Sequence, residues 1–267
     1  MSENAPVFAG SIPGNYHQYL VPLIFEDYAA DLAKQIKVPS GGSVLELACG
    51  TGVVTKHLRG VLPASTRLVA TDLNPGMLET AQRMLSAVKG IEFQIADGTD
   101  LPFDDASFDA VVCQFGVMFF PDKSRGFSEA ARVLKPGGRL HFNVWDSLEY
   151  NAYGKLVHEV MLSLSPDLTF MAMPFGYCDI RTIRAALEAA GFREIEDSIQ
   201  FRDSQASSAN DIVMGLVAGS PLAAELEARA LTAQGREAVK SALIAKYGEG
   251  PISAPMQAVV FMAAKPL

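Results

Sequence analysis

The sequence predicts an α/β protein whose helices alternate with the strands of a doubly wound, mostly parallel sheet. Three observations support this fold class. Short apolar runs, typical of strands buried on both faces, alternate with segments of helical periodicity. The first such run ends in a glycine turn that leads directly into a helix. A later helix and strand are joined by a Pro-Gly turn, KPGG.

The first strand, Val44–Ala48, is apolar apart from Glu46 and breaks into the turn Gly50–Gly52. Glycines at such a turn let the backbone bend sharply and let a ligand approach the main chain. The helix that begins at Val53 points its free N–H groups at the turn. We therefore expect a ligand site at the carboxyl end of this strand.

The residues of the turn favour a cationic ligand over a dinucleotide. A dinucleotide fingerprint, GxGxxG/A, would place Gly or Ala where this chain has Thr55. The negative charge of Glu46 would repel a pyrophosphate and attract an amine or a sulfonium. An NAD-dependent oxidoreductase is therefore a disfavoured alternative.

At this point the chain resembles motif I of the class I S-adenosylmethionine-dependent methyltransferases, with Ala48 where that family most often has glycine. Residues 101–103 (LPF), 108–109 (FD) and 132–138 (RVLKPGG) resemble the ubiquinone and menaquinone biosynthesis C-methyltransferases and their small-molecule relatives. The resemblance is specific over about Val44–Trp145. It implies a Rossmann-like, seven-stranded sheet with an antiparallel last strand, S-adenosyl-L-methionine as cofactor, and transfer of a methyl group to a small-molecule acceptor.

The second strand, Thr66–Leu73, ends in Asp72, about 20 residues past the glycine turn. A carboxylate at that place can accept hydrogen bonds from both hydroxyls of a ribose. The alternative is an N-cap for the next helix, a role that Asn74 suits better because it stands directly before Pro75. We therefore predict that Asp72 binds ribose.

The third and fourth strands also end in polar or aromatic residues. Ile91–Asp97 ends in Asp97, which the resemblance assigns to the adenine amine; a turn-initiating aspartate is the alternative. The fourth strand runs from Asp109 to Gln114, followed by Phe115. This end lacks the Asn/Asp-Pro-Pro-aromatic tetrapeptide of enzymes that methylate nucleobase amines.

The candidate site residues form three groups. The predicted cofactor-binding residues, from the motifs and the resemblance, are Glu46, Ala48, Cys49, Gly50, Gly52, Asp72, Leu73, Met77, Ala96, Asp97, Gly98, Gln114 and Tyr19. The acceptor-site candidates are Phe115, Tyr177 and Trp145, which ends the fifth strand; simple core packing is the alternative for the lone Trp. Tyr16 and His17 are candidate general bases. His141 and Tyr177 are further candidates, and no spacing selects one of the four. A base is needed only if the acceptor holds its proton tightly at neutral pH.

The N-terminal part is expected to be helical. Apolar residues recur at helical spacing over Tyr16–Ile36, with a break near Pro22. We expect residues 1–40 to form a lid ahead of a cofactor-binding core at 41–146. A helix that only packs against the core is the alternative.

Residues 147–267 are expected to complete the same domain. Ile195–Phe201 and Ala258–Ala263 suit a final antiparallel pair of strands, and Asp211–Tyr247 reads as helices inserted between them. Such an insertion could cap the acceptor cleft. Its apolar, Met-rich character suggests a bulky apolar acceptor, with ordinary core filling as the alternative.

Composition restricts the partners. With 30 acidic and 22 basic residues the formal net charge is −8, which argues against nucleic acid and anionic membranes as partners. No apolar run approaches the ~18 residues of a spanning helix, and no signal peptide is evident, so a cytoplasmic protein is expected. The three cysteines lack CxxC spacing and no magnesium-type acid cluster appears, so no metal is expected. The oligomeric state is left open, as is a binding protein without catalysis on the same fold.

Overall fold

One seven-stranded sheet organises the protein, whose computed structural model describes residues 8–267. The strand order is β3-β2-β1-β4-β5-β7-β6. Strands β1 to β5 run parallel, and β7 pairs antiparallel with both β5 and β6. This confirms the predicted fold class, including its antiparallel last strand. The strands are β1 Ser43–Glu46, β2 Arg67–Asp72, β3 Ile91–Ile95, β4 Phe108–Gln114, β5 Leu134–Trp145, β6 Arg193–Ala206 and β7 Ile252–Ala264.

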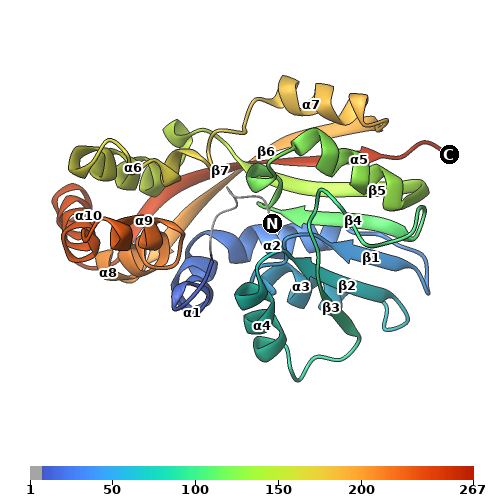
Figure 1. The fold of residues 1–267 in the computed structure, drawn as a ribbon, viewed down its shortest axis with the longest axis horizontal. Coiled ribbons are helices and arrows are strands. Elements are labelled where there is room, and N and C mark those ends of the chain that lie inside the picture. The colour runs from blue at the N-terminus through green and yellow to red at the C-terminus, as the bar shows by residue number, and fades with distance from the viewer. Residues whose placement is uncertain (1–7) are drawn as a thin grey trace.

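Helices cover both faces of the sheet, as Figure 1 shows. In that view α2 and α3 pack against each other and α4 lies beside β2 and β3, all in the lower half, while α5 and α7 lie in the upper half beside β5 and β6. The central strands β1 and β4 are almost wholly buried between these layers, which explains their apolar sequences. The helices are α2 Glu26–Gln35, α3 Val53–Val61, α4 Pro75–Met84, α5 Lys123–Val133 and α7 Ile180–Ala189.

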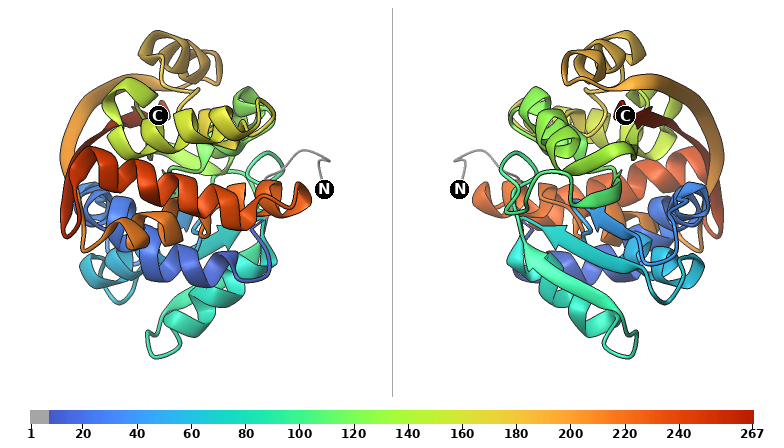
Figure 2. Two further views of the ribbon diagram at one scale, coloured as in Figure 1. Left: turned by 90° about the vertical axis from the view of Figure 1, so that its left-hand side faces the viewer. Right: turned by 90° about the vertical axis from the view of Figure 1, so that its right-hand side faces the viewer.

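The remaining helices gather at one end of the sheet, on the left in Figure 1. Seen from that end, α10 crosses in front, between α6 and the N-terminal helices (Figure 2, left). This helical cap combines segments from the N-terminal part of the chain with segments from its C-terminal half. Its elements are α1 Ile12–Asn15, the π-helical η1 Tyr16–Phe25, α6 Ala152–Leu164, α8 Ala209–Ile212, the π-helical η5 Val213–Val217, α9 Leu222–Ala228 and α10 Thr232–Tyr247, with short 3-10 turns at η2 Val117–Phe119, η3 Leu148–Tyr150 and η4 Phe170–Ala172.

The N-terminal helix is wider, and less broken, than the sequence predicts. Pro22 lies inside η1, and the amide of Glu26 donates to the carbonyl of Val21, five residues back. Proline lacks an N–H and its ring would clash with the carbonyl one turn earlier in an α-helix. The wider π-helical turn accommodates this ring, so the chain continues into α2 without a break. Residues 1–7 of the expected lid lie outside the described residues.

The order in which strands are added to the sheet reverses at β1. After β1 the chain builds outward through β2 and β3 and then crosses back to β4 on the other side of β1. A crevice forms at the carboxyl ends of the strands on either side of such a reversal. This crevice is where the cap meets the sheet.

The last strands are longer than predicted. The expected strands at 195–201 and 258–263 fall within β6 and β7, and the KPGG residues, expected as a turn before the fifth strand, lie inside β5. The register of β5 against β4 shifts between Phe108 and Ala110, and Gly137 takes a positive φ of 77°. Between these two pairs β4 advances by two residues and β5 by five, so KPGG forms an irregularity within β5, and regular pairing with β4 resumes at Arg139.

Candidate active site

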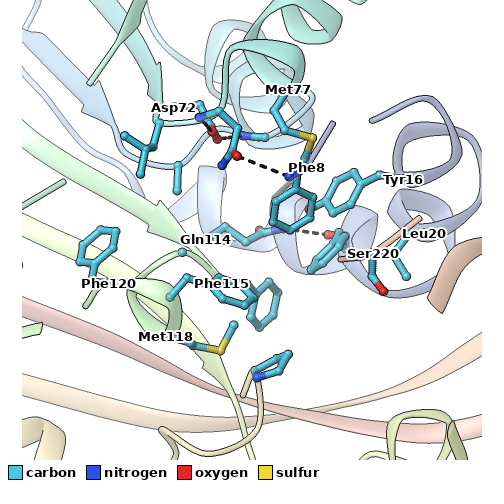
Figure 3. Close-up of a pocket in the computed structure, with 18 of the residues that line it drawn as sticks. Phe8, Tyr16, Leu20, Asp72, Met77, Gln114, Phe115, Met118, Phe120 and Ser220 are labelled. Atoms are coloured by element: carbon cyan, nitrogen blue, oxygen red, sulfur yellow. Dashed lines mark hydrogen bonds between the residues drawn. The ribbon is translucent and has the colours of Figure 1, made fainter. Parts of the chain in front are cut away.

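A large cavity occupies the crevice between the sheet and the cap (Figure 3). It contains about 1200 Å³ of space, counting the solvent at its mouth. Twelve of the predicted site residues line it: Tyr16, Ala48, Gly50, Asp72, Leu73, Met77, Ala96, Asp97, Gly98, Gln114, Phe115 and Trp145.

The glycine turn is built from left-handed backbone. Ala48, Gly50 and Gly52 have φ values of 51°, 56° and 87°. At Ala48, where the resembled family usually has glycine, this conformation costs roughly 1–2 kcal/mol for a residue with a Cβ. A Cβ on Gly50 would lie 3.6 Å from the Met77 Cε, inside the cavity. The turn therefore needs small residues to leave the main chain open to a ligand.

Gly52 was predicted to bind the cofactor, but a side chain at this position would point away from the cavity. A Cβ there would lie 2.8 Å from the Leu85 Cδ1 and 3.3 Å from the Ala81 Cβ. Its absence lets α4 pack closely against the start of α3. Gly52 thus shapes the turn without lining the cavity.

Asp72 is fixed by the turn that it faces. Its Oδ2 accepts a hydrogen bond from the Gly50 amide at 2.8 Å, and its Oδ1 accepts one from the Asn74 amide at 2.8 Å. A carboxylate oxygen has two lone pairs, so each oxygen keeps one for a ligand. Burial raises the pKa of Asp72, and the two amide hydrogen bonds oppose that rise. The side chain is therefore a rigid double acceptor at the carboxyl end of β2.

Asp97 and Gln114 supply the other polar groups of the wall. The Asp97 Oδ1 accepts from the Thr99 amide at 2.8 Å and from the Thr99 hydroxyl at 2.7 Å. Gln114 donates from Nε2 to the Phe25 carbonyl at 3.2 Å, while its Oε1 is buried without a partner. These carboxylate and amide oxygens offer acceptors to hydrogen-bond donors in the cavity.

Glu46 and Cys49 differ from the prediction that they contact a ligand. Glu46 is only 1% exposed and lies behind the turn, and its Oε2 has no hydrogen-bond partner. Burial, together with the charge of Asp72, raises the pKa of Glu46 to about 8. The Cys49 side chain packs behind the turn with Ala70 and Leu78. Glu46 is concealed because β1 is buried on both faces, whereas Cys49, which follows β1, is kept from the cavity by its packing against Ala70 and Leu78.

Three further candidates lie outside the cavity wall. His17 is bonded through Nδ1 to the Thr51 Oγ1 at 3.0 Å, which links η1 to the glycine turn, and burial lowers its pKa. The backbone of Tyr19 packs against Gly215 in the cap. Tyr177 lies 5.0 Å from the Lys123 Nζ, measured to its ring centre.

Among the candidate bases only Tyr16 lines the cavity. Burial, with the nearby charge of Asp72, raises its pKa well above the usual range, so its phenol stays protonated. His141 is 3% exposed inside β5, and burial lowers its pKa to about 4. Among the described residues, no lysine, arginine or histidine lines the cavity.

An aromatic wall closes the side opposite the acids. Phe115 and Trp145 stack at 3.9 Å between ring centres, with 9° between their planes. Phe25 packs against both, at 5.4 and 5.9 Å. Phe115 has a positive φ of 51°, held by its amide, which donates to the Asn143 Oδ1 at 3.2 Å. Trp145 therefore packs in the core and lines the cavity at the same time.

The sequence analysis did not identify most of the side chains of this apolar wall. Leu20, Ile24 and Phe25 come from η1, Phe170 and Phe175 from the loop around η4, and Leu216 and Ser220 from the cap. Helical periodicity marked Leu20 and Ile24 as apolar, and the large side chains of 166–179 were evident. No pattern placed these segments beside one another.

Residues 8–267 contain neither a candidate metal site nor a helix that could span a membrane. No group of three His, Cys, Asp or Glu residues is arranged to hold a metal ion. No helix in this part of the chain is long and apolar enough to cross a bilayer.

Comparison with known proteins agrees with this geometry. Residues 45–142 match the family model described as a methyltransferase domain. The demethylmenaquinone methyltransferase of Clavibacter sepedonicus is 36% identical over 169 residues, which are 59% of this chain and 68% of that protein. A ubiquinone/menaquinone biosynthesis C-methyltransferase of Geotalea daltonii is 32% identical over 136 residues, covering 50% of this chain and 58% of the relative.

A solved structure shares the fold across nearly the whole chain. The YcgJ protein of Bacillus subtilis superposes with a TM-score of 0.63 at 19% identity, covering 90% of this chain and 99% of that one. The fold is therefore shared well beyond the stretch with clear sequence similarity.

Proposed function

The chain belongs to the class I S-adenosylmethionine-dependent methyltransferases, and from this premise we propose that its acceptor is an uncharged, predominantly apolar small molecule. Methyl transfer to a small-molecule acceptor follows from the family. The class of acceptor is the finer proposal, and the observation that supports it is the aromatic wall without a cationic side chain.

The donor half of the cavity fits a nucleoside amino acid. Asp72 keeps one lone pair on each oxygen, which suits the two hydroxyls of a ribose. Asp97, with the backbone of Ala96 and Gly98, would hold the adenine, and Met77 would pack against it. A pyrophosphate would find carboxylates and no cation here, which disfavours NAD. When bound, S-adenosylmethionine supplies a methyl group already activated on a sulfonium.

The chain's own contribution to the reaction is mainly alignment. Phe115 and Trp145, stacked in parallel with Phe25 packed beside them, give the acceptor an apolar surface to lie against. Tyr16 can donate a hydrogen bond, because its phenol stays protonated. No histidine or lysine lines the wall, and its carboxylates Asp72 and Asp97 are assigned to the nucleoside, so the acceptor should lose its proton to water or already carry its nucleophilic electron pair.

The names of the relatives agree with an apolar acceptor. The protein of Clavibacter sepedonicus is named for demethylmenaquinone. An apolar quinol of that class would suit the aromatic wall. A phosphate would find no cationic side chain there, and the carboxylates Asp72 and Asp97 are taken up by the nucleoside, so a charged amine would have only ring faces to contact. The net charge of −8 further supports excluding nucleic acid. We also propose residues 8–40 as a lid, and a cytoplasmic location on composition alone.

A methyl-transfer assay with labelled cofactor tests this proposal. The panel compares naphthoquinols and apolar phenols with polar amines such as phosphoethanolamine and histamine. We expect label in the apolar acceptors at a kcat/KM at least tenfold above that of any charged one. Preferred labelling of a charged acceptor would refute the proposed class. Binding of S-adenosylhomocysteine with no labelled product across a broad metabolite extract would instead indicate a binding protein.

A further inference from the structure

Phe120 borders the cavity next to Gly98, directly after the short turn η2. In Figure 3 it lies on the left, across the open space from Tyr16. The neighbouring ring of Phe119 takes another direction and stacks with Phe170 of the apolar wall, at 6.4 Å between ring centres. The two consecutive rings therefore border different parts of the cavity, and Phe120 belongs to the donor half.

Two glycines form a slot that holds the Phe120 ring. A Cβ on Gly98 would lie 2.5 Å from the ring Cζ, and a Cβ on Gly126 in α5 would lie 2.5 Å from the ring Cδ2. The ring tip therefore rests on the main chain after β3, and one ring edge rests on the main chain of α5. Glycine weakens a helix relative to alanine, and at position 126 its missing side chain makes room for this ring.

The two walls of the slot are tied together. The Arg125 Nε in α5 donates to the Thr99 carbonyl at 3.0 Å, which joins the helix to the turn that follows Gly98. The Lys123 Nζ donates to the Phe120 carbonyl at 3.0 Å, which fixes the main chain that carries the ring. Main chain lies against the ring on two sides, so the space left open to it is the cavity itself.

The slot adjoins the place that suits an adenine amine. Asp97 comes directly before Gly98, and both residues line the cavity. Both hydrogen bonds from Thr99 go to the Oδ1 of Asp97, which leaves Oδ2 for the amine. With the amine bound there, the space beyond its nitrogen lies next to Gly98 and is bounded by the Phe120 ring. An unsubstituted amine fits this space, whereas a bulky group on the amine would meet the ring.

We propose that Phe120 determines specificity for the cofactor. Its ring closes the donor half beyond the adenine amine and excludes nucleosides that carry a substituent on that nitrogen. Gly98 and Gly126 are the positioning residues that hold the ring in place. The proposal rests on the proposed placement of the adenine at Asp97, and it does not depend on the class of acceptor.

Calorimetry with two ligands tests this role without turnover. S-adenosylhomocysteine is compared with its derivative that carries a benzyl group on the adenine amine. The unmodified protein should bind the derivative at least about 30-fold more weakly, because the added ring has to displace a fixed one. Phe120→Ala removes a phenyl ring equal in size to the one added to the ligand, so the two affinities should come within about threefold of each other.

Phe119→Ala is the matched control for the ring. It removes the same side chain one position away, where the ring packs on Phe170, so the discrimination between the two ligands should persist. The melting temperatures of both variants show whether the fold is retained.

A second pair of variants tests the slot. Gly126→Ala should push the Phe120 ring into the cavity and weaken binding of S-adenosylhomocysteine itself at least about fivefold. Alanine is the better helix former, so α5 itself should not be weakened. Gly60→Ala is the control, because a Cβ on Gly60 in α3 meets nothing within 4 Å. In Gly126→Ala/Phe120→Leu the smaller side chain should bring the affinity back to within about twofold.

Equal affinity of the two ligands for the unmodified protein would overturn the role of Phe120, as would discrimination that survives in Phe120→Ala. Unchanged affinity in Gly126→Ala would overturn the role of the slot. Asp97→Ala checks the adenine placement and should weaken S-adenosylhomocysteine at least about fivefold. Unchanged affinity in that variant would overturn the placement and this proposal together. Preferred labelling of a charged acceptor in the transfer assay would refute the acceptor class alone.

Discussion

The two halves of the cavity are built by different means. The donor half comes from the ends of β1, β2 and β3, and its key group, Asp72, is held by backbone amides two and 22 residues away in the chain. The acceptor half comes from η1, the loop around η4 and the cap, which only the folded structure brings together. The donor half is therefore fixed by local hydrogen bonds, and the acceptor half by packing between distant segments.

The largest expected effect is a loss of cofactor affinity when Asp72 in the donor half is replaced. Asp72→Ala removes a double acceptor and the anchors of the Gly50 and Asn74 amides. Affinity for S-adenosylhomocysteine should fall at least tenfold, ~1.4 kcal/mol, as measured by calorimetry. Asp104→Ala, at an exposed loop position, is the control. The KM of the acceptor should change little, and unchanged cofactor affinity would remove Asp72 from the donor site.

A change in the acceptor half should give the opposite pattern. Phe170 lines the cavity and stacks in parallel with Phe119, with 6.4 Å between their ring centres. Phe170→Leu should raise the acceptor KM about fivefold, because roughly 1 kcal/mol of apolar contact is lost. Cofactor affinity should stay within about twofold. Steady-state kinetics with both substrates varied would expose any coupling between the halves as a parallel loss.

A third prediction concerns the buried charge behind the donor half. Burial raises the pKa of Glu46 to about 8 in the folded protein, from an ordinary value of 4.5, so the folded state holds a proton that the unfolded chain loses. Stability should therefore fall as the pH rises from about 5 to about 8, and level off above.

Glu46→Gln should flatten that decline. Thermal melts across this pH range give the comparison, and the variant should gain stability relative to the unmodified protein as the pH rises. Equal slopes for the two proteins would mean that Glu46 is charged when folded.

The smallest expected effect is at the contact between the two halves. His17 in η1 is bonded to Thr51 in the glycine turn at 3.0 Å. His17→Ala should weaken cofactor binding about threefold, within the ~0.5–1.5 kcal/mol of one hydrogen bond. Thr51→Val should weaken it equally, and the double variant should be no worse than either single one. Additive losses would show that the two side chains act independently.

The sequence predicted the donor half because its residues follow one another in short motifs. Gly50, Asp72 and Asp97 each follow a strand, and parallel strands present their carboxyl ends at one edge, so position in the chain determined position in space. The same reasoning misplaced Glu46, since a strand buried on both faces conceals its side chains even beside a ligand site. The seven-stranded sheet and its antiparallel last strand agreed with the family resemblance.

Apart from Phe115 and Trp145, which lie at strand ends, the acceptor half was not predictable in this way. Phe25, Phe170 and Leu216 meet only because η1, the η4 loop and the cap pack on one another. Apolar side chains carry no directional signal, so periodicity could mark Ile24 as buried and could not say what it faces. The π-helical turn at Pro22, which sets where Phe25 lies, also had no signature beyond a proline expected to break the helix.

A crystal structure of the complex with S-adenosylhomocysteine tests the central claim most directly. The account predicts the ribose hydroxyls within hydrogen-bond distance of the Asp72 carboxylate, and the sulfur facing the open space beside Phe115 and Trp145. A nucleoside bound away from Asp72, or a sulfur directed away from the aromatic wall, would contradict it.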